Sequence, residues 1–341
     1  MASRISPLAA SKPGVVLVTG GAGYIGSHAV KALRQAGFEA VIYDNLSAGH
    51  RQAALGAPLI QGDIGDVAAV RRALRETGAS AVMHFAAWLS VPDSVRDPVG
   101  YYRNNVTGTL GTLEAMAAEG VKTFVFSSTC AVYGEPIETP LRETHPTAPI
   151  NAYGQTKLAI EQALPHIEAA HGIRSIRLRY FNAAGADPDG ELGEDHLPEI
   201  HIIPRTIESI VGGAPLKLFG EDYPTPDGTC LRDYIHVTDL ADAHVRALAR
   251  LQDGGPSASY NLGTGRPSSV KAVIAAVEKA TGRRAVVEKA PRRPGDPAAL
   301  FAAAERAHAD LGWAPQRSLE TIVADAWRWH AAHPHGFGDR H

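Results

Sequence analysis

A continuous apolar run followed directly by a glycine-rich loop is the feature that most restricts the fold of this chain. Residues 15–20 read VVLVTG, and Gly20, Gly23 and Gly26 then lead into a helical pattern. An unbroken β-branched run is typical of a strand buried on both faces of a parallel sheet. Glycine permits a tight turn and a close backbone approach, and the helix start offers free N–H groups to an anion. The pattern predicts a strand, phosphate-binding loop and helix.

Short apolar runs alternate with helical patterns through the first half of the chain, which predicts an α/β fold of the Rossmann type, a doubly wound parallel sheet. The expected strands cover residues 15–20, 40–45, 57–63, 81–87, 123–129 and 175–182. The expected helices begin near residue 67 and cover about 98–119 and 153–170. A further strand–helix unit occupies 232–251, with Thr238 as the expected N-cap.

The domain organisation is predicted from where this alternation stops. Pro, Gly and acidic residues crowd the chain after residue 182. We expect a flexible tail over residues 1–14 and a dinucleotide-binding domain over 15–182, to which 236–260 return. Residues 183–235 and 261–341 are expected to form a smaller α/β substrate-binding domain.

Composition excludes several classes of partner. A net charge of −3 in 341 residues does not indicate nucleic acid, and no apolar stretch approaches the ~18 residues of a membrane helix. The first 14 residues lack the apolar core of a secretory signal. Cys130 and Cys230 lie far apart, which favours free thiols and a cytoplasmic location. Without HxxxH or CxxC spacing, no metal site is expected.

Asp44 indicates which dinucleotide is bound. It ends the second predicted strand 18 residues after Gly26, where a carboxylate binds both ribose hydroxyls and repels a 2′-phosphate. NAD is therefore the expected cofactor. The competing interpretation of Asp44 is a turn or capping residue. Asp63, at the end of the third strand, is expected near the adenine.

Thr129, Tyr153 and Lys157 are the candidate catalytic residues. A Tyr with a Lys four residues later is a weak signal alone, because a half-buried Tyr beside a solvated Lys is common. Oxidising a secondary alcohol, however, requires a base for the hydroxyl proton. A phenol has a pKa near 10, and a nearby ammonium together with NAD⁺ would lower it. Thr129 ends the fifth strand, where ligands bind, and its hydroxyl can orient the substrate oxygen.

These motifs together resemble the extended short-chain dehydrogenase/reductase family. The glycine loop, SSTCAVYG (127–134) and YGQTK (153–157) carry the resemblance. Within the family, NNVTGT (104–109), RYFNAAGADPDGELGEDH (179–196), the stretch 223–244, NLGTG (261–265) and RRPGDP (292–297) resemble the UDP-glucose 4-epimerases. The resemblance covers roughly residues 15–335.

The resemblance implies a set of cofactor-binding and substrate-binding residues. Those implied for NAD are Gly20, Gly23, Tyr24, Ile25, Gly26, Asp44, Asn45, Ser47, Asp63, Ile64, Phe85, Ala86, Ala87, Asn105, Thr129, Tyr153, Lys157 and Phe181. Those implied for a UDP-sugar are Thr129, Tyr153, Asn182, His201, Ile202, Lys217, Leu218, Phe219, Arg232, Arg293, Asp296 and Leu300. A homodimer through the helices at 98–119 and 153–170 is also implied.

The implied reaction interconverts UDP-galactose and UDP-glucose by oxidation at sugar carbon 4, rotation of the 4-keto sugar and reduction on its other face. Leu300 at the sugar-pocket gate and Leu89, in place of a frequent Lys, depart from the family pattern. Epimerisation of UDP-xylose/UDP-arabinose or of UDP-N-acetylhexosamines therefore stays open.

Three different activities on the same fold compete with epimerisation. A 4,6-dehydratase would need an acidic pair where Cys130 and Ala131 stand, so its elimination step lacks the required groups. A dehydrogenase or reductase would release its nicotinamide in each cycle, and dependence on added NAD distinguishes it from an epimerase. An NAD-binding sensor would not need the intact set of Thr129, Tyr153 and Lys157.

Overall fold

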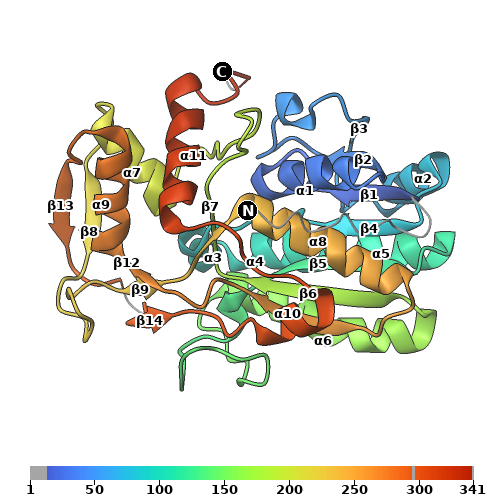
Figure 1. Cartoon of the computed structure of the whole chain (residues 1–341). Coiled ribbons are helices and arrows are strands. Elements are labelled where there is room, and N and C mark those ends of the chain that lie inside the picture. Colours follow the sequence, from blue (N-terminus) through green and yellow to red (C-terminus); the bar gives the residue numbers. More distant parts are fainter. Residues whose placement is uncertain (1–13, 294–295, 340–341) are drawn as a thin grey trace.

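A seven-stranded parallel sheet forms the centre of the larger part of the molecule (Figure 1). The computed structural model describes residues 14–293 and 296–339, so the predicted tail, except Gly14, lies outside the described residues. The strand order is β11-β6-β5-β4-β1-β2-β3, and every neighbouring pair is parallel. The strands are β1 (Val15–Thr19), β2 (Glu39–Asp44), β3 (Leu59–Gln61), β4 (Ala81–His84), β5 (Thr123–Thr129), β6 (Arg174–Tyr180) and β11 (Ala258–Leu262). The predicted Rossmann-type class is confirmed.

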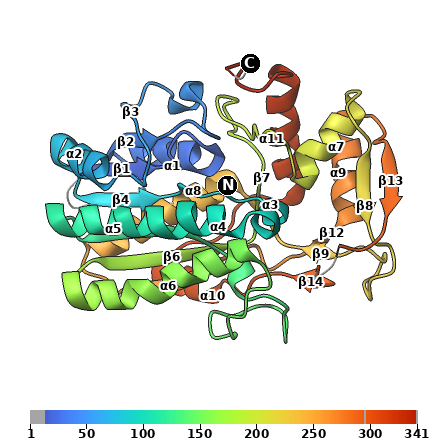
Figure 2. The same ribbon diagram turned by 180° about the vertical axis from the view of Figure 1, so that it is seen from behind.

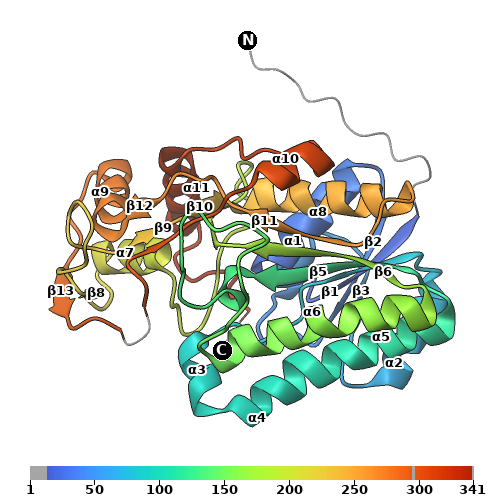
Figure 3. The ribbon, with the colours of Figure 1, turned by 90° about the horizontal axis from the view of Figure 1, so that it is seen from below.

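Helices cover both faces of this sheet, as Figure 3 shows. Side chains alternate along β1, so Val16 and Val18 pack in one apolar core while Leu17 packs in the other. The helices α1 (Tyr24–Gln35), α8 (Val237–Gln252) and α10 (Glu305–Leu311) lie on the first face. On the second face lie α2 (Val67–Thr77), α5 (Gly108–Glu119) and α6 (Ala152–His171). Strands enclosed on both sides explain the unbroken apolar runs in the sequence.

The predicted helix at 98–119 contains a change of helical type. It is preceded by α3 (Val91–Arg96), begins as α4 (Pro98–Tyr101), widens into a π-helical segment over Tyr102–Thr107 and continues as α5. π-helical turns occur frequently at functional sites because they shift the direction of one side chain. Asn105, a predicted cofactor residue, lies in this segment.

The smaller part of the molecule is built from short sheets and three helices, grouped at one end of the large sheet (Figure 2). Its helices α7 (Ile202–Ile210), α9 (Val270–Thr281) and α11 (Leu319–Ala332) share an apolar core. Its strands are β7 (Asn182–Ala184), β8 (Leu216–Phe219), β9 (Leu231–Arg232), β10 (Tyr234–His236), β12 (Ser268–Ser269), β13 (Val287–Ala290) and β14 (Ala299–Leu300). The residues at which the chain divides between the two parts stay a prediction.

The predicted N-cap Thr238 is wrong by two residues. α8 begins after His236, whose Nδ1 accepts a hydrogen bond from the Thr238 backbone N–H at 3.1 Å. The imidazole of His236 therefore caps α8, a role that was expected of the Thr238 hydroxyl. Within residues 14–293 and 296–339, no helix is both long enough and apolar enough to cross a membrane.

Candidate active site

The glycine loop joins β1 to α1, and its glycines serve different structural purposes. Gly20 has φ +71°, and a Cβ there would lie 2.5 Å from the Ala86 nitrogen. A Cβ on Gly26 would lie 2.1 Å from the Gly20 oxygen. Gly23 is the N-cap of α1, and no side chain caps the helix start. The loop thus packs tightly on the sheet and leaves the first amides of α1 without a side-chain partner.

Asp44 braces this loop from the end of β2. Its Oδ2 accepts a hydrogen bond from Ala22 N at 3.0 Å, and its Oδ1 accepts one from Leu46 N at 2.8 Å. The carboxyl is buried, and burial raises its pKa although the two N–H donors oppose the shift. Asp44 therefore holds the loop in place, and each oxygen retains a second lone pair.

The other predicted cofactor residues gather around the carboxyl ends of β1 to β5. Asn45 donates from Nδ2 to Asp63 Oδ2 at 2.9 Å and accepts from Ser47 N at 3.0 Å. Asn105 is buried, and its amide bridges the backbone of Trp88 and the hydroxyl of Thr156. The remaining residues of this group lie at the start of α1 or shortly after the ends of β3 and β4: Tyr24, Ile25, Ile64, Phe85, Ala86 and Ala87.

The candidate catalytic residues lie where β5 ends and α6 begins. Thr129 is the last residue of β5, its hydroxyl accepts a hydrogen bond from Ala131 N at 3.1 Å, and it lies close enough to the Tyr153 phenol to influence the pKa of that phenol. Asn151 caps α6 by accepting from Gly154 N at 2.8 Å, which places Tyr153 in the first turn. Lys157, one turn later, is buried and donates from Nζ to Ser127 O at 2.8 Å. The structure therefore brings the three predicted residues to one edge of the sheet.

Burial shifts the pKa values of Tyr153 and Lys157 in opposite directions. It raises the pKa of Tyr153 to about 12, although the Thr129 hydroxyl opposes the shift. It lowers the pKa of Lys157 to about 7, although the Glu161 carboxylate favours the charged ammonium. In the chain alone, desolvation rather than Lys157 therefore decides the direction of the Tyr153 pKa shift.

Sequence reasoning missed a buried polar network beneath α6. Glu161 accepts from Ser128 Oγ at 2.5 Å and from Arg179 Nε at 3.0 Å. Arg179 Nη1 also donates to the Tyr133 hydroxyl at 3.0 Å. Glu161 follows Lys157 by four residues, so the i, i+4 spacing was the available signal.

Several predicted substrate residues lie together in the smaller part of the molecule. Arg232 pairs with Asp296, and Leu300 is opposite Arg232 in the register of β14 and β9. The Arg293 guanidinium lies 4.0 Å from the centroid of the Phe219 ring, a cation–π contact. Two adjacent pairs result, and in each a second side chain orients an arginine: Asp296 orients Arg232, and Phe219 orients Arg293.

Other predicted substrate residues make different contacts. Asn182 donates from Nδ2 to the Asp233 carbonyl at 2.9 Å. Leu218 is buried in a small apolar cluster, whereas Lys217 beside it is exposed. His201 and Ile202 stand at the start of α7. Leu300 and Phe181 both pack in the cluster next to Leu158.

Comparisons with known proteins agree with this arrangement. The NAD dependent epimerase/dehydratase family matches residues 16–263. The UDP-glucose 4-epimerase of Halalkalibacterium halodurans is 49% identical over 324 residues, covering 94% of this chain and 97% of that protein. The crystal structure of UDP-glucose 4-epimerase from Brucella ovis in complex with NAD is 46% identical with a TM-score of 0.91, covering 93% and 98% of the two chains.

A UDP-glucose-4-epimerase structure from Stenotrophomonas maltophila, with bound NAD and formylated UDP-arabinopyranose, is also similar. It is 41% identical with a TM-score of 0.91, covering 94% of this chain and 98% of that chain. These similarities extend over both parts of the molecule. The chain therefore belongs to the NAD dependent epimerase/dehydratase family and, within it, to the UDP-glucose 4-epimerases.

Proposed function

We propose that the chain interconverts UDP-galactose and UDP-glucose, using tightly bound NAD to oxidise and then reduce sugar carbon 4. The observation that carries the proposal is the placement of Thr129, Tyr153 and Lys157 together at the carboxyl end of β5. A base, a hydroxyl and an ammonium at this edge are the groups that alcohol oxidation requires.

The residues around the glycine loop fit NAD. Gly23 and the uncapped start of α1 suit a pyrophosphate, since free N–H groups and the helix dipole favour an anion. The free lone pairs of Asp44 suit the two hydroxyls of a ribose without a 2′-phosphate. When bound, the nicotinamide ring takes up and returns the hydride of sugar carbon 4 and adds a positive charge.

The proton of the sugar 4-hydroxyl passes to Tyr153. Because burial raises the pKa of this phenol to about 12, it needs positive charge beside it to act as a base near neutral pH. The charged form of Lys157, held on Ser127 O, supplies part of that charge. Thr129 orients the sugar oxygen through its hydroxyl.

The arginines of the smaller part hold the diphosphate of the UDP-sugar. A guanidinium fork suits phosphate oxygens, and Asp296 and Phe219 fix the orientations of Arg232 and Arg293. Because these charged contacts act on the nucleotide, the 4-keto sugar is free to turn over between the two hydride transfers. The other residues of the proposed nucleotide-sugar site are Asn182, His201, Ile202, Lys217 and Leu218.

A second substrate class follows from Leu300 and one structural neighbour. Leu300 packs against the apolar cluster that contains Phe181 and Leu158, so its side chain limits the room near the sugar. The Stenotrophomonas maltophila structure holds formylated UDP-arabinopyranose. UDP-xylose/UDP-arabinose and UDP-N-acetylhexosamines are therefore the alternative substrates.

We also propose a homodimer in the cytoplasm. The helices α3 to α5 expose large apolar side chains, which a partner helix layer would cover: Val95, Val99, Tyr102 and Leu110. Both Cys130 and Cys230 are free thiols, in agreement with a reducing compartment. Light scattering coupled to gel filtration measures the oligomeric state.

The function is tested by incubating the purified chain with UDP-galactose and no added NAD, followed by chromatography of the nucleotide sugars. Formation of UDP-glucose is the expected result. The Tyr153→Phe variant should retain NAD but lose at least about 100-fold in turnover, while Tyr260→Phe, which alters a phenol bonded to Asp310, serves as the control. Bound NAD without turnover of any UDP-hexose or UDP-pentose would instead favour the sensor.

A further inference from the structure

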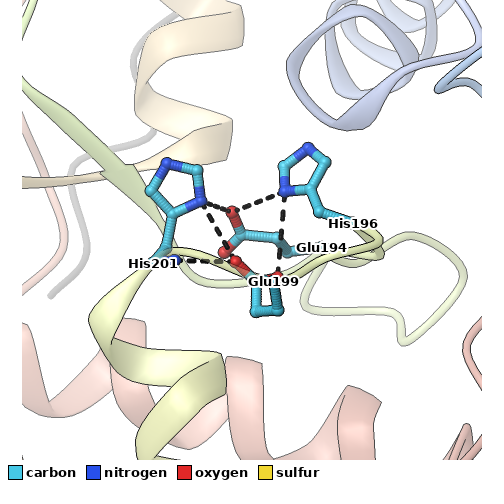
Figure 4. Close-up of side chains that lie close together, drawn as sticks. All are labelled: Glu194, His196, Glu199 and His201. Carbon is cyan, nitrogen blue, oxygen red and sulfur yellow. Dashed lines mark hydrogen bonds and ion pairs between the residues drawn. The ribbon is translucent and has the colours of Figure 1, made fainter. Parts of the chain in front are cut away.

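Four side chains in the loop before α7 approach one another closely: Glu194, His196, Glu199 and His201 (Figure 4). We propose that they bind one divalent transition-metal ion of the zinc type. Each offers one ligand atom, and these four atoms all lie within 4.8 Å of one another. The proposal goes beyond the epimerase reaction, although His201 also belongs to the proposed nucleotide-sugar site.

The spacing of the ligand atoms fits one small ion. Metal–ligand bonds of roughly 2.0–2.2 Å in a tetrahedral site place neighbouring ligand atoms roughly 3.3–3.6 Å apart. Glu194 Oε1 lies 3.3 Å from His196 Nδ1 and 2.7 Å from His201 Nδ1. Glu199 Oε2 lies 3.8 Å from His196 Nδ1. These separations bracket the tetrahedral value.

Three of the ligand atoms are buried without a hydrogen bond. Glu194 Oε1, His196 Nδ1 and His201 Nδ1 are close in distance, but none of them has a partner in hydrogen-bonding geometry within residues 14–293 and 296–339. Glu194 is only 4% exposed, so water does not compensate. Buried polar atoms that crowd together without bonding to each other are what shared coordination of an ion explains.

Backbone groups hold Glu199 in the orientation that the site needs. Its Oε1 accepts hydrogen bonds from Ile200 N at 2.7 Å and from His201 N at 2.8 Å. Such outer contacts fix the rotamer of a metal-binding carboxylate and leave its other oxygen available. Oε2, which faces His196, is therefore the proposed ligand atom of Glu199.

Among the described residues, the two carboxylates of the cluster have no permanently charged partner. In the part of the chain that the structure describes, the ion-pair partners of Glu194 and Glu199 are the two histidines, and neither carboxylate pairs with a Lys or Arg. A nearby acidic group behaves differently, because Lys31 Nζ contacts Asp187, Asp189 and Glu191 at 2.7, 2.8 and 2.7 Å. In that group the Lys31 ammonium already contacts all three carboxylates and offsets part of their negative charge.

The donor set selects the type of ion. Two imidazole nitrogens and two carboxylate oxygens suit Zn²⁺ and its neighbours, whereas Mg²⁺ and Ca²⁺ prefer oxygen ligands alone. The motif is E-x-H-x-x-E-x-H over residues 194–201, a spacing outside the HxxxH and CxxC patterns that sequence reasoning considered. The proposal therefore departs from the prediction that the chain has no metal site.

The ion would have a structural role at the junction of the two parts. The ring of His196 lies edge-on to Tyr24 in the first turn of α1, with centroids 6.1 Å apart. His201 immediately precedes α7. One ion bound by residues 194–201 thus links the glycine-loop helix to the entry of α7.

The test measures metal in the full chain, produced without a polyhistidine tag. Elemental analysis of wild type, after incubation with ZnCl2 and gel filtration, is expected to give about one zinc per chain. His196→Ala and Glu199→Gln should each lose most of this zinc. His166→Ala, which removes an exposed histidine of α6, is the matched control and should keep it. Circular dichroism verifies that each variant is folded.

A second measurement does not depend on variants. Replacing zinc with Co²⁺ in the wild-type chain should produce the visible absorption of a tetrahedral cobalt site, and a chelator should remove the absorption and lower the unfolding temperature. Restoring zinc should restore that temperature. A wild-type chain that binds neither Zn²⁺ nor Co²⁺ at micromolar concentration would overturn the proposal, as would folded variants that retain a full equivalent.

Discussion

The Glu161 carboxylate pairs with the Arg179 guanidinium inside the protein, one helical turn beyond Lys157. Arg179 Nε lies 3.0 and 3.1 Å from the two carboxylate oxygens of Glu161, and both side chains are buried. The same carboxylate favours the charged state of Lys157. A pair that supports the sheet therefore also influences the charge of Lys157, a predicted catalytic residue.

Glu161→Gln should affect both stability and the pH dependence of turnover. Leaving Arg179 buried without its carboxylate is expected to cost about 3–5 kcal/mol of unfolding free energy. The pKa of Lys157 should fall further, so the alkaline limb of the kcat profile should move to lower pH. Denaturant unfolding and a pH–rate profile measure the two effects.

The control for that variant is Glu119→Gln, which breaks the surface pair with Arg71 and Arg75. It should leave both the unfolding midpoint and the pH profile in place. An unshifted profile in Glu161→Gln would show that the carboxylate has only a packing role.

Lys157 should make the stability of the NAD-free chain depend on pH. Its pKa is about 7 when folded and about 10.4 when unfolded, so between these values the unfolded chain binds one more proton. Unfolding free energy should therefore rise with pH in that window, by up to about 1.4 kcal/mol per pH unit.

Lys157→Met removes this titration and should make the free energy of unfolding less dependent on pH. Urea unfolding of both proteins at pH 7.5 and 9.5 measures the difference, and Lys122→Met, which alters a lysine at the surface, is the control. Equal slopes in wild type and Lys157→Met would mean that the ammonium stays charged in the folded chain.

Asp44→Asn should weaken NAD binding and reduce the preference for NAD over NADP. The amide can accept from only one of the two N–H donors and no longer repels a 2′-phosphate. We expect a loss of about 10-fold to 100-fold in NAD affinity, measured by calorimetry on the NAD-free chain.

Asp66→Asn is the matched control, because Asp66 caps α2 by accepting from Ala69 N at 2.9 Å. It should leave the affinities for both dinucleotides unchanged. If Asp44→Asn keeps the wild-type ratio of NAD affinity to NADP affinity, Asp44 serves only to brace the glycine loop.

Arg232→Lys should raise KM for UDP-galactose by about tenfold or more while kcat stays close to wild type. Lysine keeps the charge but loses the fork that Asp296 orients, and the diphosphate is bound equally before and during reaction. Steady-state kinetics measure both constants, with Arg284→Lys in an exposed pair as the control. A lower kcat at unchanged KM would place Arg232 in the chemical step.

Local sequence patterns determined the Rossmann sheet, the positions of six of its seven strands and the meeting of Thr129 with Tyr153, but not β11. Buried parallel strands need unbroken apolar runs, and the carboxyl ends of such strands must share an edge, so position along the chain implies position in space. The spacing of Tyr153 and Lys157 needed only the helical repeat.

Contacts between distant segments were decided only by the tertiary structure. The pair of Glu161 with Arg179 and the support of Arg232 by Asp296 both depend on packing that no periodicity encodes. The opposite pKa shifts of Tyr153 and Lys157 likewise arise from desolvation, which is a property of the assembled interior. The sequence thus determined which groups are present at the site, and folding decided their charge and their partners.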